Sequence, residues 1–153
     1  MSIVDERVYA AAAEGDPRAL GTVVPAVRAL VTRRCRAELS ASIGLEQADV
    51  EAQRISRDII SALPRHNGAS LLAFVNRQAR HDVARLSKRR RRSKEVGSLI
   101  DRLPDDEREV LILRVLSGLS VADTAVALGL SPARVLLDQH RALSRLREQL
   151  RAG

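Results

Sequence analysis

Apolar residues recur every three or four positions along most of this chain, which is the spacing that places them on one face of an α-helix. The pattern is clearest after residue 70, where Leu71, Val75 and Val83 share one side and Arg77 and Arg85 lie on the other. This stretch therefore predicts an amphipathic helix with a cationic outer face. The helices predicted in the first half span residues 5–15, 17–38, 45–63 and 70–88.

Turn-forming residues separate these helices. Gly15-Asp16-Pro17 ends the first helix and supplies an N-cap and a first-turn proline to the second. Pro25 is expected to kink or divide that second helix, because a helix-interior proline lacks the N–H that the backbone ladder needs. Residues 40–44 are predicted to break it, and Pro64 is predicted to stop the third helix, whose apolar positions include Val50.

The second half begins with a predicted turn of helix over residues 98–103 and a helix from Pro104 to Gly118. Asp105, Asp106 and Glu107 fall in the first turn of that helix. Acidic side chains there interact favourably with the helix dipole, which explains the cluster without a carboxylate site.

Residues 119–148 carry the signals of a helix-turn-helix. Ser120 is a suitable N-cap with Asp123 three residues later, and Gly129 suits the left-handed residue that ends a helix. Ser131-Pro132 then starts a longer helix, in which Val135 is expected to face the first one. This arrangement inserts its second helix in a DNA major groove, although a helical hairpin without a DNA role shares many of the same signals.

Composition favours helices throughout. The 153 residues include no tryptophan and two aromatic side chains, Tyr9 and Phe74, whereas sheet proteins normally use many β-branched and aromatic residues. Aliphatic residues are frequent enough to form a core. We therefore predict an all-α fold of two small helical domains, over residues 1–88 and 98–153, joined by a basic linker over residues 89–97.

Positive charge is concentrated in one stretch. Residues 71–94 carry nine lysine or arginine residues against one acid, Asp82, so they contribute +8 to a formal net charge of +7 and the rest sums to −1. A local basic run of this kind points to an extended polyanion such as DNA. The alternative is a solvated linker that only keeps the protein soluble.

Several function classes lack support in the sequence. A lone cysteine, Cys35, cannot form an internal disulfide and is expected to be a buried or idle thiol, as in a reducing cytoplasm. The three histidines, His66, His81 and His140, lie far apart without cysteine partners, so no metal site is expected. The chain shows no signal peptide, membrane span or glycine-rich phosphate loop. We expect a cytoplasmic protein that is not an enzyme and uses no cofactor.

Residues 103–148, LPDDEREVLILRVLSGLSVADTAVALGLSPARVLLDQHRALSRLRE, resemble region 4 of the sigma-70 family. The similarity is greatest to its extracytoplasmic-function branch, and the QHRAL segment resembles the actinobacterial sigma-D-like group. More weakly, residues 10–90 resemble region 2, through ADVEAQRISRDIISALPR and LLAFVNRQARHDVARLSKRR. The resemblance implies core RNA polymerase and promoter DNA as partners, and an anti-sigma factor or other regulatory protein as a further one.

The resemblance also implies roles for individual residues. Region 2 would dock on polymerase and open the −10 DNA, and region 4 would read the −35 element. By similarity, the polymerase-binding residues are Asp49 and Gln53. The DNA-binding residues implied are Asn76, Arg77, Arg80, His81, Arg85, Lys88, Arg89, Arg114, Ser131, Arg134, Asp138, Arg141 and Arg145.

Two alternatives remain open at the level of sequence. Val50 and Arg54 stand where the family usually has acids, and Leu136 and Leu137 occupy the expected reading surface, where they could form a small apolar contact surface. The ten residues 88–97 reach at most about 35 Å, whereas promoter elements two duplex turns apart are separated by about 70 Å. One alternative is a degenerate sigma-like regulator that acts through protein contacts. The other is a dimeric helix-turn-helix repressor.

Overall fold

The protein is all-helical in its computed structural model, which describes residues 5–65, 70–91 and 99–153 and has no strand among them. This confirms the predicted fold class. The α-helices are α1 (Glu6–Ala13), α2 (Pro17–Ile43), α3 (Leu45–Ala62), α4 (Leu71–Arg91), α5 (Asp105–Leu111), α6 (Val121–Leu128) and α7 (Pro132–Ala152). Short 3-10 turns cover Leu63–Arg65 and Leu99–Arg102, and a π-helical turn covers Ile112–Leu116.

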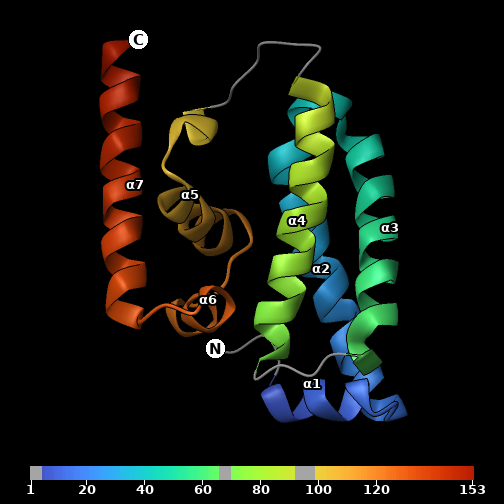
Figure 1. The fold of residues 1–153 in the computed structure, drawn as a ribbon. Helices are drawn as coiled ribbons and strands as arrows, with labels where there is room; N and C mark the ends of the chain where they lie inside the picture. Colours follow the sequence, from blue (N-terminus) through green and yellow to red (C-terminus); the bar gives the residue numbers. More distant parts are fainter. Residues whose placement is uncertain (1–4, 66–69, 92–98) are drawn as a thin grey trace.

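The first four helices form a bundle in which α2, α3 and α4 lie alongside one another and α1 crosses one end (Figure 1). Helix α6 packs against α4, and α7 lies on the far side of α5 and α6 from the bundle (Figure 1). The main hydrophobic core lies inside the bundle, with Val23, Val27, Ile55, Val75 and Val83 all fully buried.

Helix α2 is longer than the sequence predicted. Pro25 lies inside it without dividing it, and the predicted break at residues 40–44 shrinks to Gly44, whose φ of 85° ends the helix. Val23 and Val27 on either side of the proline are completely buried. We attribute the continuity to this packing, which stabilises the helix through a position where the backbone ladder loses one bond.

Two further details of the helices were not anticipated. Val50 is 55% exposed, because α3 faces the core through the small residues Ala48 and Ala52 together with Ile55 and Ile59. The helix predicted from Pro104 to Gly118 is α-helical as far as Leu111 and then widens into the π-helical turn.

The helix-turn-helix signals are confirmed in detail. The Ser120 hydroxyl accepts the backbone N–H of Asp123 at 3.0 Å, and Gly129 is left-handed with φ 67°. Ser131 caps α7, and Val135 is fully buried in a small cluster with residues of α5 and α6. Local capping chemistry therefore fixes both the turn and the face by which α7 contacts its neighbour.

Cys35 lies in the main core and is fully buried, as expected for an idle thiol. Burial raises the pKa of this thiol to about 12. Because the thiolate is the reactive form, its fraction near neutral pH falls by about a thousandfold relative to a free cysteine. We expect iodoacetamide to modify the folded chain at least about a hundredfold more slowly than the urea-unfolded chain at the same pH. Equal rates would contradict this placement of Cys35.

None of the described helices has the length and apolar character needed to cross a bilayer. In the same residues, no group of three or more histidine, cysteine or acidic side chains is placed to hold a metal ion. His66 and residues 92–97 of the predicted linker lie outside the described residues.

Candidate nucleic-acid interface

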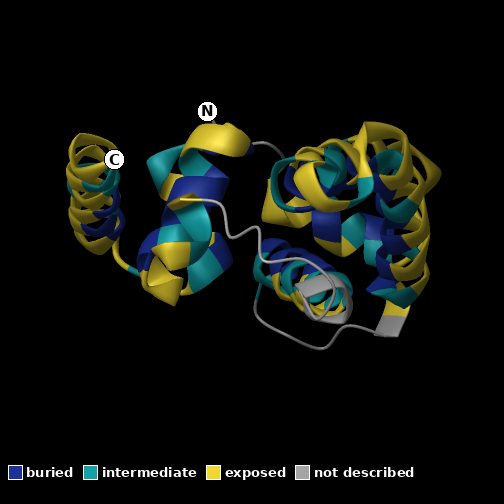
Figure 2. Cartoon of the chain, turned by 90° about the horizontal axis from the view of Figure 1, so that it is seen from above, coloured by how far each residue is buried: buried dark blue, intermediate teal, exposed yellow. Residues whose placement is uncertain are grey.

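Helix α7 presents a long exposed face to solvent. The face lies at the edge of the molecule, turned away from the bundle (Figures 1 and 2). It combines cations with two apolar side chains, Leu136 at 54% and Leu137 at 42% exposure. Its exposed cations include Arg134, Arg141 and Arg145. A helix that follows a tight turn and leaves one basic face uncovered can enter a DNA groove.

Asp138 does not lie on this exposed face, contrary to its predicted place on the reading surface. It is 1% exposed because it shares the inward side of α7 with Val135 and Ala142, three residues before and four after it. Its Oδ2 accepts a hydrogen bond from Arg134 Nε at 2.8 Å. This bond and the charge of the carboxylate raise the pKa of Arg134 above its ordinary value.

Other predicted residues of the second half also have partners within the chain. Arg114 is half-buried, and its guanidinium donates to Gln139 Oε1 at 2.9 Å and to the Leu119 carbonyl at 2.6 Å. It therefore connects the π-helical turn to α7. Arg145 forms an ion pair with Glu107 at 2.9 Å, although its side chain remains 55% exposed.

The predicted DNA-binding residues of α4 are partly exposed and partly buried. Arg77, His81 and Arg85 are exposed. Asn76 is 2% exposed, and Arg80 is half-buried with its Nε 3.3 Å from Glu109 Oε1. Lys88 and Arg89 belong to α4, but their side chains lie outside the described residues. The exposed members form a cationic strip, whereas Asn76 is buried and Arg80 pairs with Glu109 of the second half.

A buried polar network joins the two halves at this point. Arg34 of α2 is 1% exposed and donates to Glu38 at 2.9 Å, to Asn76 Oδ1 at 3.0 Å and to Glu109 Oε1 of α5. The same carboxylate oxygen of Glu109 receives Arg80. Burial raises the pKa of Glu38 above its ordinary value, although Arg34 opposes that effect.

Apolar packing and a second polar contact accompany the network. Leu113, Leu119 and Ala127 of the second half belong to the same hydrophobic cluster as the bundle core. Arg33 Nη1 also donates to the Ser117 carbonyl at 2.8 Å. In this arrangement the two halves are packed against each other.

The predicted polymerase-binding residues lie on α3. Asp49 is held by Arg36 of α2 through two hydrogen bonds of 2.7 and 2.9 Å, which lower the pKa of this carboxyl. Gln53 is exposed one turn later. Arg54 lies beside it and pairs with Glu51 at 3.0 Å and Asp58 at 3.3 Å.

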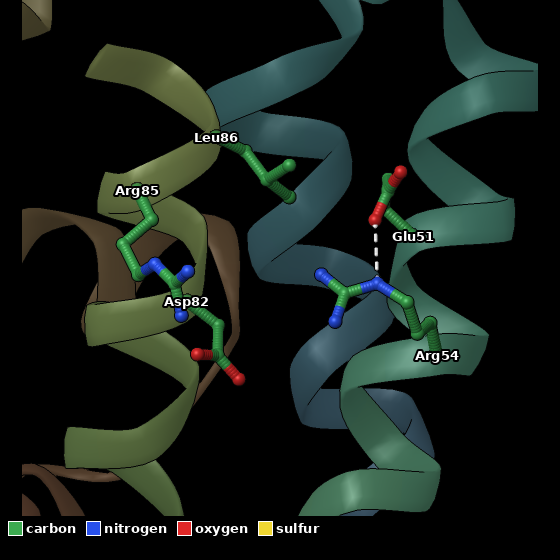
Figure 3. A pocket seen from close by; sticks show the side chains of 5 residues that line it. All are labelled: Glu51, Arg54, Asp82, Arg85 and Leu86. Carbon is green, nitrogen blue, oxygen red and sulfur yellow. Dashed lines mark hydrogen bonds and ion pairs between the residues drawn. The ribbon is translucent and has the colours of Figure 1, made fainter. Parts of the chain in front are cut away.

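A cavity of about 220 Å³ lies between α3 and α4 (Figure 3). It is lined by Glu51, Arg54, Asp82, Arg85 and Leu86. The wall carries two acids and two cations, and Arg54 is hydrogen-bonded to Glu51 within it. Neither charge dominates, so the cavity offers no evident preference for an anion or a cation.

The chain is similar to known proteins in both sequence and structure. A family model described as "Sigma-70, region 4" matches residues 93–146. The chain is 34% identical over 188 residues to the ECF RNA polymerase sigma factor SigD of Mycobacterium tuberculosis, covering 100% of this chain and 88% of that protein. It is 34% identical over 171 residues to the ECF RNA polymerase sigma factor ShbA of Streptomyces griseus, covering 89% and 90%.

The solved structure of CnrH in complex with the cytosolic domain of CnrY is also similar. It matches with a TM-score of 0.64 and 26% identity, over 97% of each chain. The match includes both halves of the present chain together.

Proposed function

Because the chain belongs to the extracytoplasmic-function (ECF) family of RNA polymerase sigma factors, we propose that it binds core RNA polymerase and directs initiation at specific promoters. The observation that carries the proposal is the intact helix-turn-helix, whose second helix α7 presents an exposed cationic face. In such a motif the N-terminal residues of the second helix contact base edges.

We assign the −35 element to α7 and the −10 DNA to α4. In α7, Arg134 lies near the end that would enter the groove, and Arg141 lies two turns further along. In α4, Arg77, His81 and Arg85 form the exposed strip. Arg80 pairs with Glu109 of the second half, and Asn76 is buried and hydrogen-bonded to Arg34. The predicted DNA contacts of these two side chains would therefore require those bonds to break.

Docking on core polymerase is assigned to α3, through Asp49 and Gln53. Both lie on one side of the helix, four residues apart. Polymerase supplies the chemistry of transcription, so the proposed role needs no catalytic residue in this chain. The proposed site of action is the cytoplasm, where polymerase and chromosome meet.

A regulatory protein partner is also proposed. CnrH was solved with the cytosolic domain of CnrY bound, and the present chain aligns with CnrH over nearly its whole length. We therefore propose that a comparable partner protein engages this chain.

In vitro transcription tests the main proposal. Purified core polymerase and the full chain are combined on fragments of the genome that encodes it, and the transcripts are mapped. Specific starts that depend on the chain support a sigma factor. Core binding without transcripts would favour a degenerate regulator, and binding to a palindromic site without core affinity would favour a dimeric repressor.

Asp49→Ala should weaken binding to core polymerase by about tenfold, which is the effect of removing one charged contact of moderate strength. Asp58→Ala is the matched control, since this exposed acid lies on the opposite side of the same helix. Fluorescence anisotropy with labelled chain measures both affinities. If the two variants lose affinity equally, Asp49 has no specific role.

A further inference from the structure

The first turn of α7 holds Arg134 at two points. The Ser131 hydroxyl accepts the backbone N–H of Arg134 at 3.1 Å, and Asp138 accepts its Nε at 2.8 Å. Arg134 is the third residue of the helix, so it belongs to the part of a recognition helix that meets the bases.

The two ends of the Arg134–Asp138 pair differ strongly in exposure. The Asp138 side chain is 2% exposed, whereas the Arg134 side chain is 47% exposed. An ordinary surface pair has two mobile ends, but here the core around Val135 and Ala142 fixes the acid. A buried carboxylate requires a hydrogen-bonded partner, and Arg134 provides one. The buried carboxylate of Asp138 therefore restrains the guanidinium of Arg134, which faces solvent.

The bond to Asp138 leaves much of the guanidinium for a ligand. A guanidinium has five N–H donors, and Nε carries one of them. The two Nη groups remain, and a pair of arginine N–H donors matches O6 and N7 of guanine in the major groove. Holding the side chain in advance reduces the rotamer freedom that binding would otherwise have to remove.

We propose that Asp138 is a positioning residue for promoter recognition, and that it orients Arg134 to hydrogen-bond a guanine of the −35 element. This inference rests on the proposed function of α7. Asp138 touches no base itself. If Asp138 only neutralised a phosphate-binding arginine, it would change the affinity for all DNA alike. In the proposed role it holds Arg134 in place, and Arg134 then discriminates one base from the others.

A double-mutant cycle in the full-length chain tests the inference. A duplex is first selected by the wild-type chain, with core polymerase present, from a library randomised around the −35 region. Binding of Arg134→Ala, Asp138→Ala and the double variant is then measured on this duplex and on duplexes with each guanine replaced. Asp138→Asn is included because it keeps the shape and one acceptor oxygen. Arg147→Ala is the control for an exposed cation of the same helix.

We expect Arg134→Ala to lose about tenfold discrimination at one guanine, the effect of a bidentate contact. Asp138→Ala should lose a similar amount of discrimination at the same guanine, and Asp138→Asn should lose less. In the Arg134→Ala background, the change at position 138 should have no further effect. Arg147→Ala should weaken all duplexes equally and reduce the salt dependence by about one phosphate contact.

Two results would overturn the inference itself. If a substitution at position 138 still lowers discrimination at the guanine in the Arg134→Ala background, Asp138 acts only on the structure of the chain. Tighter binding of Asp138→Ala to every duplex would reduce its role to charge neutralisation. Failure of the wild-type chain to select any duplex would instead refute the proposed DNA reading itself. If circular dichroism shows that Asp138→Ala is unfolded, the same cycle with Asp138→Asn decides.

Discussion

Arg34→Ala will lower the free energy of unfolding by about 3–5 kcal/mol, the range found when one partner of a buried ion pair is removed. Arg34 is 1% exposed, and its guanidinium hydrogen-bonds Glu38, Asn76 and Glu109. The alanine variant leaves two carboxylates in a desolvated site without this cation. Glu109 is especially affected, since its Oε2 already lacks a hydrogen-bond partner among the described residues.

Urea unfolding followed by circular dichroism measures the change. Arg36→Ala is the matched control, because Arg36 lies two residues away and its ion pair with Asp49 is solvent-exposed. That variant should change the free energy of unfolding by at most about 1 kcal/mol. The double variant Arg34→Met, Glu109→Gln should recover part of the loss, because it removes buried charges together. Equal effects of Arg34→Ala and Arg36→Ala would show that the network adds no stability.

The sequence predicted the parts of the fold that depend on near neighbours. Ser120, Gly129 and Ser131 act within four residues of their own positions, so the local sequence was enough to identify their roles. The Arg34 network could not be predicted in this way. Its partners Asn76 and Glu109 lie 42 and 75 residues away, so no pattern within α2 could identify them, although the spacing of Arg34 from Val27 and Val31 is that of the buried face.

Asp138 is an intermediate case. Its charge suggested a surface position, but its spacing from Val135 and Ala142 is that of the buried face of α7. The helical spacing therefore predicts the burial of Asp138 correctly, whereas its charge wrongly suggests an exposed position. Pro25 shows the reverse, because tertiary packing around it outweighed a strong local preference.

The packed arrangement of the two halves has a functional consequence. Promoter elements two duplex turns apart lie about 70 Å from each other. In the structure α6 packs directly on α4, and both Arg34 and Arg80 of the bundle contact Glu109 of α5. If α4 and α7 contact the two elements at the same time, as proposed, the Arg34–Glu109 contact has to break. We therefore expect the packed chain to open when it binds polymerase and promoter DNA.

Binding to core polymerase and promoter DNA should separate the halves by tens of ångströms, in keeping with the spacing of about 70 Å between the two elements. Spin labels at Leu45→Cys on α3 and Leu150→Cys on α7 report this distance, since both positions are exposed and Cys35 is buried. The same distance in the free chain and the promoter complex would contradict opening.

Glu109→Gln should favour the open form, because it keeps the shape of the side chain but removes the charge that Arg34 and Arg80 bind. Hydrogen bonds to charged groups contribute about 1.5–3 kcal/mol, so the apparent affinity for core polymerase should rise by about 10- to 100-fold. Asp105→Asn is the control, because Asp105 is exposed on the same helix and pairs locally with Arg108. Unchanged affinity in Glu109→Gln would mean that polymerase binds without breaking the contact between the halves.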